Sequence, residues 1–428
     1  MIANLTKETQ TIMKPAHTFN QVDNFNMTRI QRTKRAMVLG GAAAYGTLTL
    51  GIGKAFAQQT PGVTDKEIRL GAWMPLTGPV APYGVPFRAG VESCIGTVNA
   101  RGGVKGRKLV YTVEDNAYNP QRTVAAARKL ISRDDVFCIA TPFGTAQSAA
   151  AFEYVLNEAK VPIVNPWGGA ADWYTPPKEG LYGAQPLPEA SSRVLGRWAA
   201  KDGHKNIIVI YGALASFEIM ANNVILGARP VRSDVVVTNY PVKFGSADYA
   251  PIALDLANKK PDALVLLLVE QEVTALLREL KQQSFKPALY GWTPIVSNAL
   301  VAIAGPGLLD GVKCTSFVAP TVSDSPAIGE YRAALAKHAP DEKPDFASLT
   351  GYGLMKTFIE ALRRIDGPPT RAALIQSLNA MRNYDSGILP LISYSPERHL
   401  GNTYFHRAQL VAGQWTAVGP PVDADQAW

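Results

Sequence analysis

The sequence is poor in cysteine, and its three cysteines lie far apart. Cys94, Cys138 and Cys314 form no C-x-x-C pair, which leaves a thiolate metal site without support. Their odd number also leaves at least one thiol unpaired within the chain. Each falls in an apolar helix or strand pattern, so the sequence predicts small, buried hydrophobic side chains.

Catalytic signatures are missing too. The sequence has no G-x-S-x-G, no H-E-x-x-H, and no G-x-G-x-x-G after an expected strand. The run Gly51 to Lys54 is similar to the end of a phosphate loop, but Leu48 stands where that motif requires glycine. The four histidines after residue 57 are isolated in polar surroundings, and we expect them at the surface. We therefore predict no enzyme, no cofactor and no metal; an enzyme with a two-lobed α/β fold is the competing class.

A basic patch and a short apolar run mark the amino-terminal part. The patch comprises Arg29, Arg32, Lys34 and Arg35. Residues 36–53 are small and apolar, and a small-x-small pattern ends at Ala57, which predicts a secretory signal peptide cleaved after that residue. A membrane anchor is the alternative, but the run barely reaches the roughly 18 residues of a span. No Cys follows Ala57, so we expect a periplasmic protein without a lipid anchor; the sequence leaves open whether translation starts at Met1 or Met27.

Charge gives little support for a nucleic-acid partner. The whole chain has a net charge of +8, but its first 57 residues hold seven Lys/Arg and only two Asp/Glu. The remainder therefore carries a net charge of +3, and it contains no basic run with interleaved aromatics. At 371 residues it exceeds the usual size of one domain, so we expect two.

The stretch from Ile68 to Asp115 predicts a strand, a helix and a second strand. Residues 68–73 form an apolar run, residues 87–98 repeat apolar positions at helical spacing, and residues 109–113 alternate. A helical crossover favours a parallel pair of strands. Further strands are expected at 136–140 and 162–165, and the turns that follow these strands then share one edge of a parallel sheet, where ligands bind.

The second half repeats the α/β alternation after an irregular rim at residues 172–188. We expect strands at 206–211, 235–240, 262–269 and 288–291, and helices at 213–227, 248–257, 270–283, 326–338, 347–365 and 370–380. The apolar run 313–318 is predicted to return to the first sheet. Residues 389–394 and 404–410 are predicted to be closing strands.

Three motifs carry a family resemblance. They are P-L-T-G-P-V-A-P-Y-G from Pro75, V-N-A-R-G-G-V-K-G-R-K-L from Val98, and V-E-D-N-A-Y-N-P-Q-R-T-V-A-A-A-R-K-L from Val113. With them the chain from Ile68 onward resembles the periplasmic leucine/isoleucine/valine-binding protein family, the type I solute receptors of ABC importers. The resemblance implies a monomer that binds a small-molecule ligand and delivers it to an inner-membrane ABC permease. A ligand sensor for a signalling partner would share this fold.

The resemblance also implies the architecture. We expect an α/β protein of two Rossmann-like lobes with parallel-rich sheets, joined by three crossovers near Pro186, Val318 and Asp385 (the type I periplasmic binding protein fold). Lobe 1 would comprise residues 58–186 and 319–385, and lobe 2 residues 187–318 and 386–428. Residues 1–57 would be the amino-terminal extension and signal peptide. The lobes should close over the ligand by a hinge motion.

Several positions match the binding residues of that family. Thr145 matches the hydroxyl residue that binds a carboxylate, and it also stands where a helix begins, so a simple N-cap is the alternative. Phe143, Trp167, Gly168 and Gly169 match the rest of that wall, and Tyr83 matches an aromatic that covers the ligand side chain. In place of a cysteine pair of some relatives the chain has Tyr118 and Gly144.

The second lobe departs from the family pattern. Phe217, after Ser216, stands where relatives have an aromatic followed by glycine, and Thr293, after Trp292, stands where amino-acid receptors often have glutamate. Glu270 is the remaining acid expected at the cleft, unless it is only a solvated residue of a first helical turn.

The aromatic content of the expected cleft favours an aromatic or bulky apolar carboxylate. The candidate apolar faces are those of Tyr83, Phe143, Trp167, Trp173, Phe217 and Trp292. A branched-chain or other amino acid held through Glu270 is the alternative, followed by amides and other small solutes.

Overall fold

The computed structural model describes residues 60–246 and 248–426. The predicted signal peptide and its cleavage site lie outside these residues and stay predictions. Within the two described ranges, no helix is long and apolar enough to cross a membrane.

The first sheet is entirely parallel, with strand order β2-β1-β3-β4-β5. Its strands are β1 (Glu67–Met74), β2 (Lys108–Asp115), β3 (Cys138–Ala140), β4 (Ile163–Val164) and β5 (Leu181–Tyr182). The predicted parallel pair of the first two strands is confirmed, with Leu70 opposite Tyr111. Parallel strands place all their carboxyl ends at one edge.

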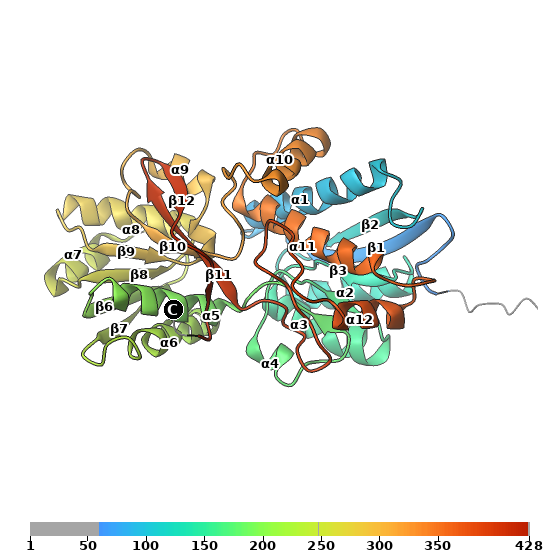
Figure 1. Cartoon of the computed structure of the whole chain (residues 1–428). Helices are drawn as coiled ribbons and strands as arrows, with labels where there is room; N and C mark the ends of the chain where they lie inside the picture. The colour runs from blue at the N-terminus through green and yellow to red at the C-terminus, as the bar shows by residue number, and fades with distance from the viewer. Residues whose placement is uncertain (1–59, 247, 427–428) are drawn as a thin grey trace, which may run out of the picture. The chain divides into compact units, whose positions relative to one another are not determined.

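Helices cover both faces of this sheet (Figure 1). They are α1 (Ala81–Ala100), α2 (Pro120–Ser132), α3 (Thr145–Phe152), α4 (Ala171–Tyr174), α10 (Pro326–His338), α11 (Phe346–Arg363) and α12 (Arg371–Asn379), and α3 continues into a π-helix at Glu153–Glu158. The alternation along β1 explains the two layers: Leu70 and Ala72 pack in one core with Phe87 of α1, whereas Trp73 packs in the other with α2 and α3.

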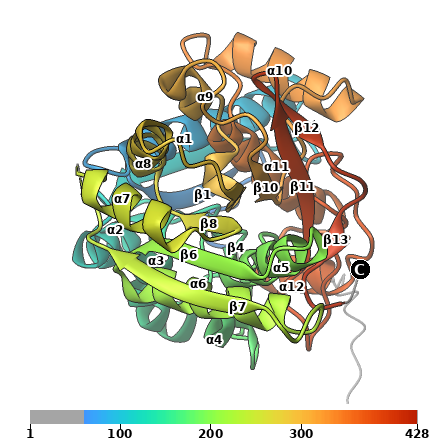
Figure 2. The same cartoon turned by 90° about the vertical axis from the view of Figure 1, so that its left-hand side faces the viewer.

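The second sheet runs in the order β12-β11-β10-β9-β8-β6-β7, and β13 pairs with β11 (Figure 2). Its strands are β6 (Asn206–Gly212), β7 (Val236–Val242), β8 (Ala263–Leu267), β9 (Ala288–Gly291), β10 (Lys313–Ser316), β11 (Tyr404–Val411), β12 (Gln414–Ala417) and β13 (Val422–Asp423). The associated helices are α5 (Pro188–Lys201), α6 (Ala215–Ala228), α7 (Ala250–Lys259), α8 (Glu270–Gln282) and α9 (Asn298–Ala304), with a 3-10 turn at Thr293–Ile295. Strands β6 to β10 are parallel, and β11 is antiparallel to β10.

Three sequence-based expectations are wrong. The run 313–318 contributes β10, which pairs with β9 and β11 of the second sheet instead of returning to the first. Residues 389–394 form no strand; an isolated bridge joins Tyr384 to Ile392. The expected irregular rim contains α4 and β5, and Trp173 and Tyr182 in it are buried because they pack in the core of the first lobe. Helix α5 had no sequence-based prediction, although it starts at Pro188 and proline is favoured in the first turn.

The segment that leads to β11 is hydrogen-bonded to the first lobe through its backbone before it enters the second sheet. Gly183 donates its N–H to the His399 carbonyl at 2.9 Å, and Gly401 donates to the Gly183 carbonyl at 2.8 Å. Ala319 donates to the Ile388 carbonyl at 2.8 Å. The lobe boundaries at residues 186, 318 and 385 stay predictions, and these bonds favour a third crossing that follows Gly401.

The cysteines and one histidine are buried. The three cysteines are buried, as predicted, and they are also free, which the sequence left open; burial raises the pKa of the Cys94 thiol to about 12. The surface prediction is wrong for His399, which is 6% exposed and stacks on Tyr182 with ring centroids 4.1 Å apart. Burial lowers the pKa of His399, which favours the neutral form of the ring.

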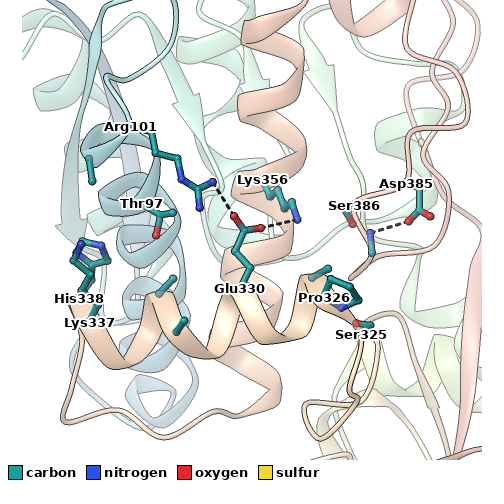
Figure 3. Close-up of a pocket in the computed structure, with 15 residues that line it drawn as sticks. Thr97, Arg101, Ser325, Pro326, Glu330, Lys337, His338, Lys356, Asp385 and Ser386 are labelled. Carbon is teal, nitrogen blue, oxygen red and sulfur yellow. Dashed lines mark hydrogen bonds and ion pairs between the residues drawn. The ribbon is translucent and has the colours of Figure 1, made fainter.

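A surface hollow of about 970 Å³ lies on the first lobe, between α1, α10, α11 and the turn 385–387 (Figure 3). Glu330 of α10 stands between two cations: its Oε1 lies 3.0 Å from Nη1 of Arg101, the C-cap residue of α1, and its Oε2 lies 3.3 Å from Lys356 Nζ of α11. One carboxylate therefore ties three helices together. Although burial opposes the shift, these cations hold the pKa of Glu330 below its ordinary value of 4.5.

We predict that Glu330→Gln lowers the free energy of unfolding at pH 7 by about 1 kcal/mol, because Arg101 and Lys356 lose their shared counter-ion. A lowered carboxyl pKa stabilises the fold above the unfolded-state value and loses that effect as pH falls. Denaturant unfolding should therefore show a difference from the native protein at pH 7 that disappears toward pH 3. The exposed Asp324→Asn serves as the control and should change little. An equal loss at both pH values would mean that Glu330 acts through packing instead of charge.

Candidate functional site

The turns after β1, β3 and β4 lie side by side at the carboxyl edge of the first sheet, as predicted. Phe143 donates its N–H to the Trp73 carbonyl at 2.9 Å, and Trp167 donates to the Pro142 carbonyl at 2.8 Å. Gly144 completes the pairing by donating to the Trp167 carbonyl at 3.0 Å. Backbone bonds thus fix the turns that carry the predicted wall residues.

Trp167 is the centre of an aromatic cluster on this wall. Its ring stacks on Phe143, with centroids 4.3 Å apart and an interplanar angle of 14°, and on Phe87 at 4.7 Å. The rings of Tyr83 and Phe346 meet it edge-on, at 6.5 and 5.8 Å. The structure therefore brings together Tyr83, Phe143 and Trp167 in one apolar wall.

Thr145 is the first residue of α3, but it is not the cap. Gly144 occupies the N-cap position, and no side chain caps the helix. The Thr145 hydroxyl instead accepts a hydrogen bond from the Gly169 N–H at 3.2 Å. Because the hydroxyl only accepts in this contact, its own proton remains available for another acceptor. The alternative reading as a simple N-cap is therefore wrong. The helix start adds a partial positive charge, which suits a carboxylate.

Gly168 and Gly169 hold the Trp167 turn against the start of α3. Gly168 has φ +138°, and a Cβ there would lie 2.9 Å from Thr145 Oγ1. Its N–H donates to Gln185 Oε1 at 3.0 Å. A side chain at this position would strain the backbone and push Thr145 away.

The second lobe contributes a smaller aromatic group. Phe217 of α6 is buried, meets Trp292 edge-on at 5.2 Å and lies 6.2 Å from the ring of Phe244. The Trp292 indole donates to the Leu268 carbonyl at 3.0 Å, which fixes its ring. Thr293 begins the 3-10 turn and is 4% exposed, so the position where relatives often have glutamate is a small, buried one here.

Three acids act on Tyr83. Burial and the charges of Glu270, Asp345 and Glu272 raise the pKa of Tyr83, so this residue of α1 lies near the start of α8 in the second lobe. Burial, opposed by a hydrogen bond with Ser297 and reinforced by the charge of Asp345, raises the pKa of Glu270. Glu270 is half-buried in the first turn of α8, and its place in the binding site stays a prediction.

Asp345, which the sequence did not single out, caps α11 and reaches the second lobe. Its Oδ1 accepts the backbone N–H of Asn298, at the start of α9, at 3.2 Å. Burial raises its pKa, although the N–H groups of Phe346 and Asn298 oppose the shift.

Trp173 does not belong to the cleft, contrary to expectation. It lies on the other face of the first sheet, where its ring meets Phe152 edge-on at 4.7 Å. Sequence reasoning missed Phe87, Phe346 and Asp345. Phe87 could have been found, because it follows Tyr83 by one helical turn; Phe346 and Asp345 are distant in sequence and gave no local signal. Among the residues that the structure describes, no group of three or more His, Cys, Asp or Glu side chains could hold a metal ion.

We predict that Gly168→Ala destabilises the protein by about 1–3 kcal/mol, because alanine must adopt a strained backbone conformation and meets Thr145. Thermal or denaturant unfolding measures the loss. Gly329→Ala is the matched control, since a Cβ at Gly329 meets no atom within 4 Å and its φ is not positive. Equal stability of the two variants would contradict the tight packing of this turn.

A family model and a named relative each match most of this chain. The periplasmic binding protein family model matches residues 67–414. Leu/Ile/Val-binding protein homolog 7 of Brucella suis biovar 1 (strain 1330) is 26% identical over 349 residues, which cover 78% of this chain and 86% of the relative.

Two solved structures share the fold. A branched-chain amino-acid ABC transporter protein from Thermus thermophilus with bound valine has a TM-score of 0.75 at 16% identity, with 84% of this chain and 97% of that chain covered. A solute-binding protein of an ABC transporter from Rhodopseudomonas palustris BisB5, in complex with 3,4-dihydroxybenzoic acid, has a TM-score of 0.70 at 22% identity, with coverages of 84% and 98%. The two-lobed α/β structure is that of a type I periplasmic binding protein, and the chain belongs to the periplasmic binding protein family, whose members are solute-binding receptors of ABC transporters.

Proposed function

We propose that this chain is the receptor of an ABC importer and that it binds an aromatic or bulky apolar carboxylate between its lobes. The observation that carries the proposal is the stack of Trp167 on Phe143 directly beside Thr145 and the start of α3. A flat ring can pack against this stack, while its carboxylate meets the Thr145 hydroxyl and the first turn of the helix. The lobes then close over the ligand, and the permease recognises the closed form.

The second lobe supports the same ligand class. Phe217 and Trp292 supply further ring surface, and Thr293 leaves no negative charge at the position where amino-acid receptors often have glutamate. An aromatic acid needs no ammonium partner there, whereas a buried ammonium must be paired. The complex of the Rhodopseudomonas palustris protein with 3,4-dihydroxybenzoic acid is compatible with this choice.

An amino acid is the second candidate, and Glu270 is the observation in its favour. This half-buried acid lies beside Tyr83, and the Thermus thermophilus protein of the same fold holds valine. The two candidates differ in whether the ligand carries an ammonium group in addition to its carboxylate, and binding assays separate them.

Membership of the family suggests where this protein is located and which protein it docks to. We infer export to the periplasm through the predicted signal peptide, cleavage after Ala57, a monomer in solution, and docking to an inner-membrane permease. A signalling partner in place of the permease would leave the pocket unchanged.

We predict that benzoate and 4-hydroxybenzoate bind the purified protein and that Thr145→Ala weakens their binding by about 1–3 kcal/mol, because the carboxylate loses a hydrogen-bond donor. Isothermal titration calorimetry measures both affinities. Thr238→Ala, on the exposed strand β7, is the control and should bind as the native protein does. Binding of leucine together with no binding of either aromatic acid would overturn the proposed ligand class.

A further inference from the structure

Tyr118 lies in the turn after β2, at the carboxyl edge of the first sheet that carries the candidate site. We propose that Tyr118 contacts the ligand and selects an aromatic ring over a saturated one. This inference rests on the proposed function and narrows its ligand from an aromatic or bulky apolar carboxylate to an aromatic one.

The turn after β2 is joined to the turn after β1 by one carboxylate. Asp115, the last residue of β2, accepts hydrogen bonds from the Leu76 N–H at 2.9 Å and from the Thr77 hydroxyl at 2.6 Å. Asp115 also accepts the N–H of Ala117, in its own turn, at 2.9 Å. These bonds fix the turn that carries Tyr118 against the neighbouring turn of the candidate site.

The start of α3 lies between this turn and the Trp167 turn. Gln147 Nε2, in the first turn of the helix, donates to the Tyr118 carbonyl at 2.8 Å, and the Thr145 hydroxyl accepts the Gly169 N–H at 3.2 Å. In the sheet, β2 and β4 lie on opposite sides of β3, so the two bonds reach the helix start from opposite sides. Tyr118 therefore flanks the proposed carboxylate site.

The Tyr118 ring extends the aromatic wall outward. It meets the Phe143 ring with centroids 6.1 Å apart and an interplanar angle of 61°, and Phe143 in turn stacks on Trp167. Exposure increases along this series, because Trp167 is 7% exposed, Phe143 is half-buried and Tyr118 is 41% exposed. Phe143 and Tyr118 thus offer a ligand more accessible ring surface than Trp167 does.

The backbone that presents this ring is strained. Tyr118 has φ +58°, and Ala117 before it has φ +45°, which is an unfavourable region for residues with a Cβ. Burial offsets little of this cost, because the ring is the exposed end of the cluster. Strained residues that the surrounding structure holds in place are concentrated at ligand-binding sites, so the strain supports a functional role for the ring.

This geometry favours an aromatic ring over a saturated one. A flat ligand ring that lies parallel to Phe143 meets the Tyr118 ring at the same steep angle as Phe143 does. Aromatic pairs prefer such edge-to-face contacts, because the positive edge of one ring meets the negative face of the other. A saturated ring buries a similar area without this electrostatic contribution, so Tyr118 adds more to the affinity of the aromatic acid.

Titration calorimetry with benzoate and cyclohexanecarboxylate tests the inference. The native protein should prefer benzoate, and Tyr118→Asn should reduce this preference by about three- to tenfold, because it removes the ring and keeps a residue that tolerates positive φ. Tyr118→Phe keeps the ring and should keep the preference. Tyr404→Asn, at a comparably exposed tyrosine that begins β11, is the matched control and should also keep it.

The outcomes separate this inference from the proposed function. Equal affinities of the native protein for the two acids would overturn the role of Tyr118, and so would a preference that survives Tyr118→Asn; in both cases the binding of an apolar carboxylate would stand. Failure of both acids to bind the native protein would overturn the proposed function, and the inference with it. Tyr118→Gly also accepts positive φ and replaces Tyr118→Asn if thermal unfolding shows that the latter does not fold.

Discussion

The packing of the Trp167 turn against the start of α3 is the constraint on which the candidate site depends. Backbone bonds between the ends of β3 and β4 fix the two turns, and Gly168 lets them approach until the Thr145 hydroxyl meets the Gly169 N–H. The stack of Trp167 on Phe143 follows from that approach. A carboxylate site and an apolar ring surface are therefore produced by one local arrangement, before any contact with the second lobe.

The second lobe adds selectivity to this preformed wall. Its aromatic pair, Phe217 and Trp292, offers a further ring surface, while Asn298 at the start of α9 donates its N–H to Asp345 of the first lobe. A ring that packs on the first wall can meet this second aromatic group when the lobes close, which is a physical reason for the proposed orientation.

The fold was largely predictable, because the periodicity of buried strands and amphipathic helices is local. The first strand–helix–strand unit and the turns at its carboxyl edge could be predicted from the spacing of apolar residues and from the Gly and Pro residues that interrupt it. The strand 313–318 could be found but not assigned to a sheet, since its apolar pattern is compatible with either one, and only its pairing with β9 and β11 decides.

The site was predictable where the family motif is continuous in sequence. Tyr83, Phe143 and Trp167 do meet, but Trp173, which has the same chemistry, packs on the opposite face of the sheet. Asp345 could not be found, because its part in the site comes from a contact with Asn298 across the lobes, 47 residues away in sequence. Composition gives the kinds of side chain available, whereas tertiary packing decides which of them share a cleft.

A crystal structure of the protein with a bound aromatic acid tests the central claim most directly. The account predicts that the ring lies between Trp167 of the first lobe and the Phe217–Trp292 pair of the second, with the carboxylate at Thr145 and the start of α3. A ligand bound outside the cleft, or one with its carboxylate turned away from Thr145, would contradict it.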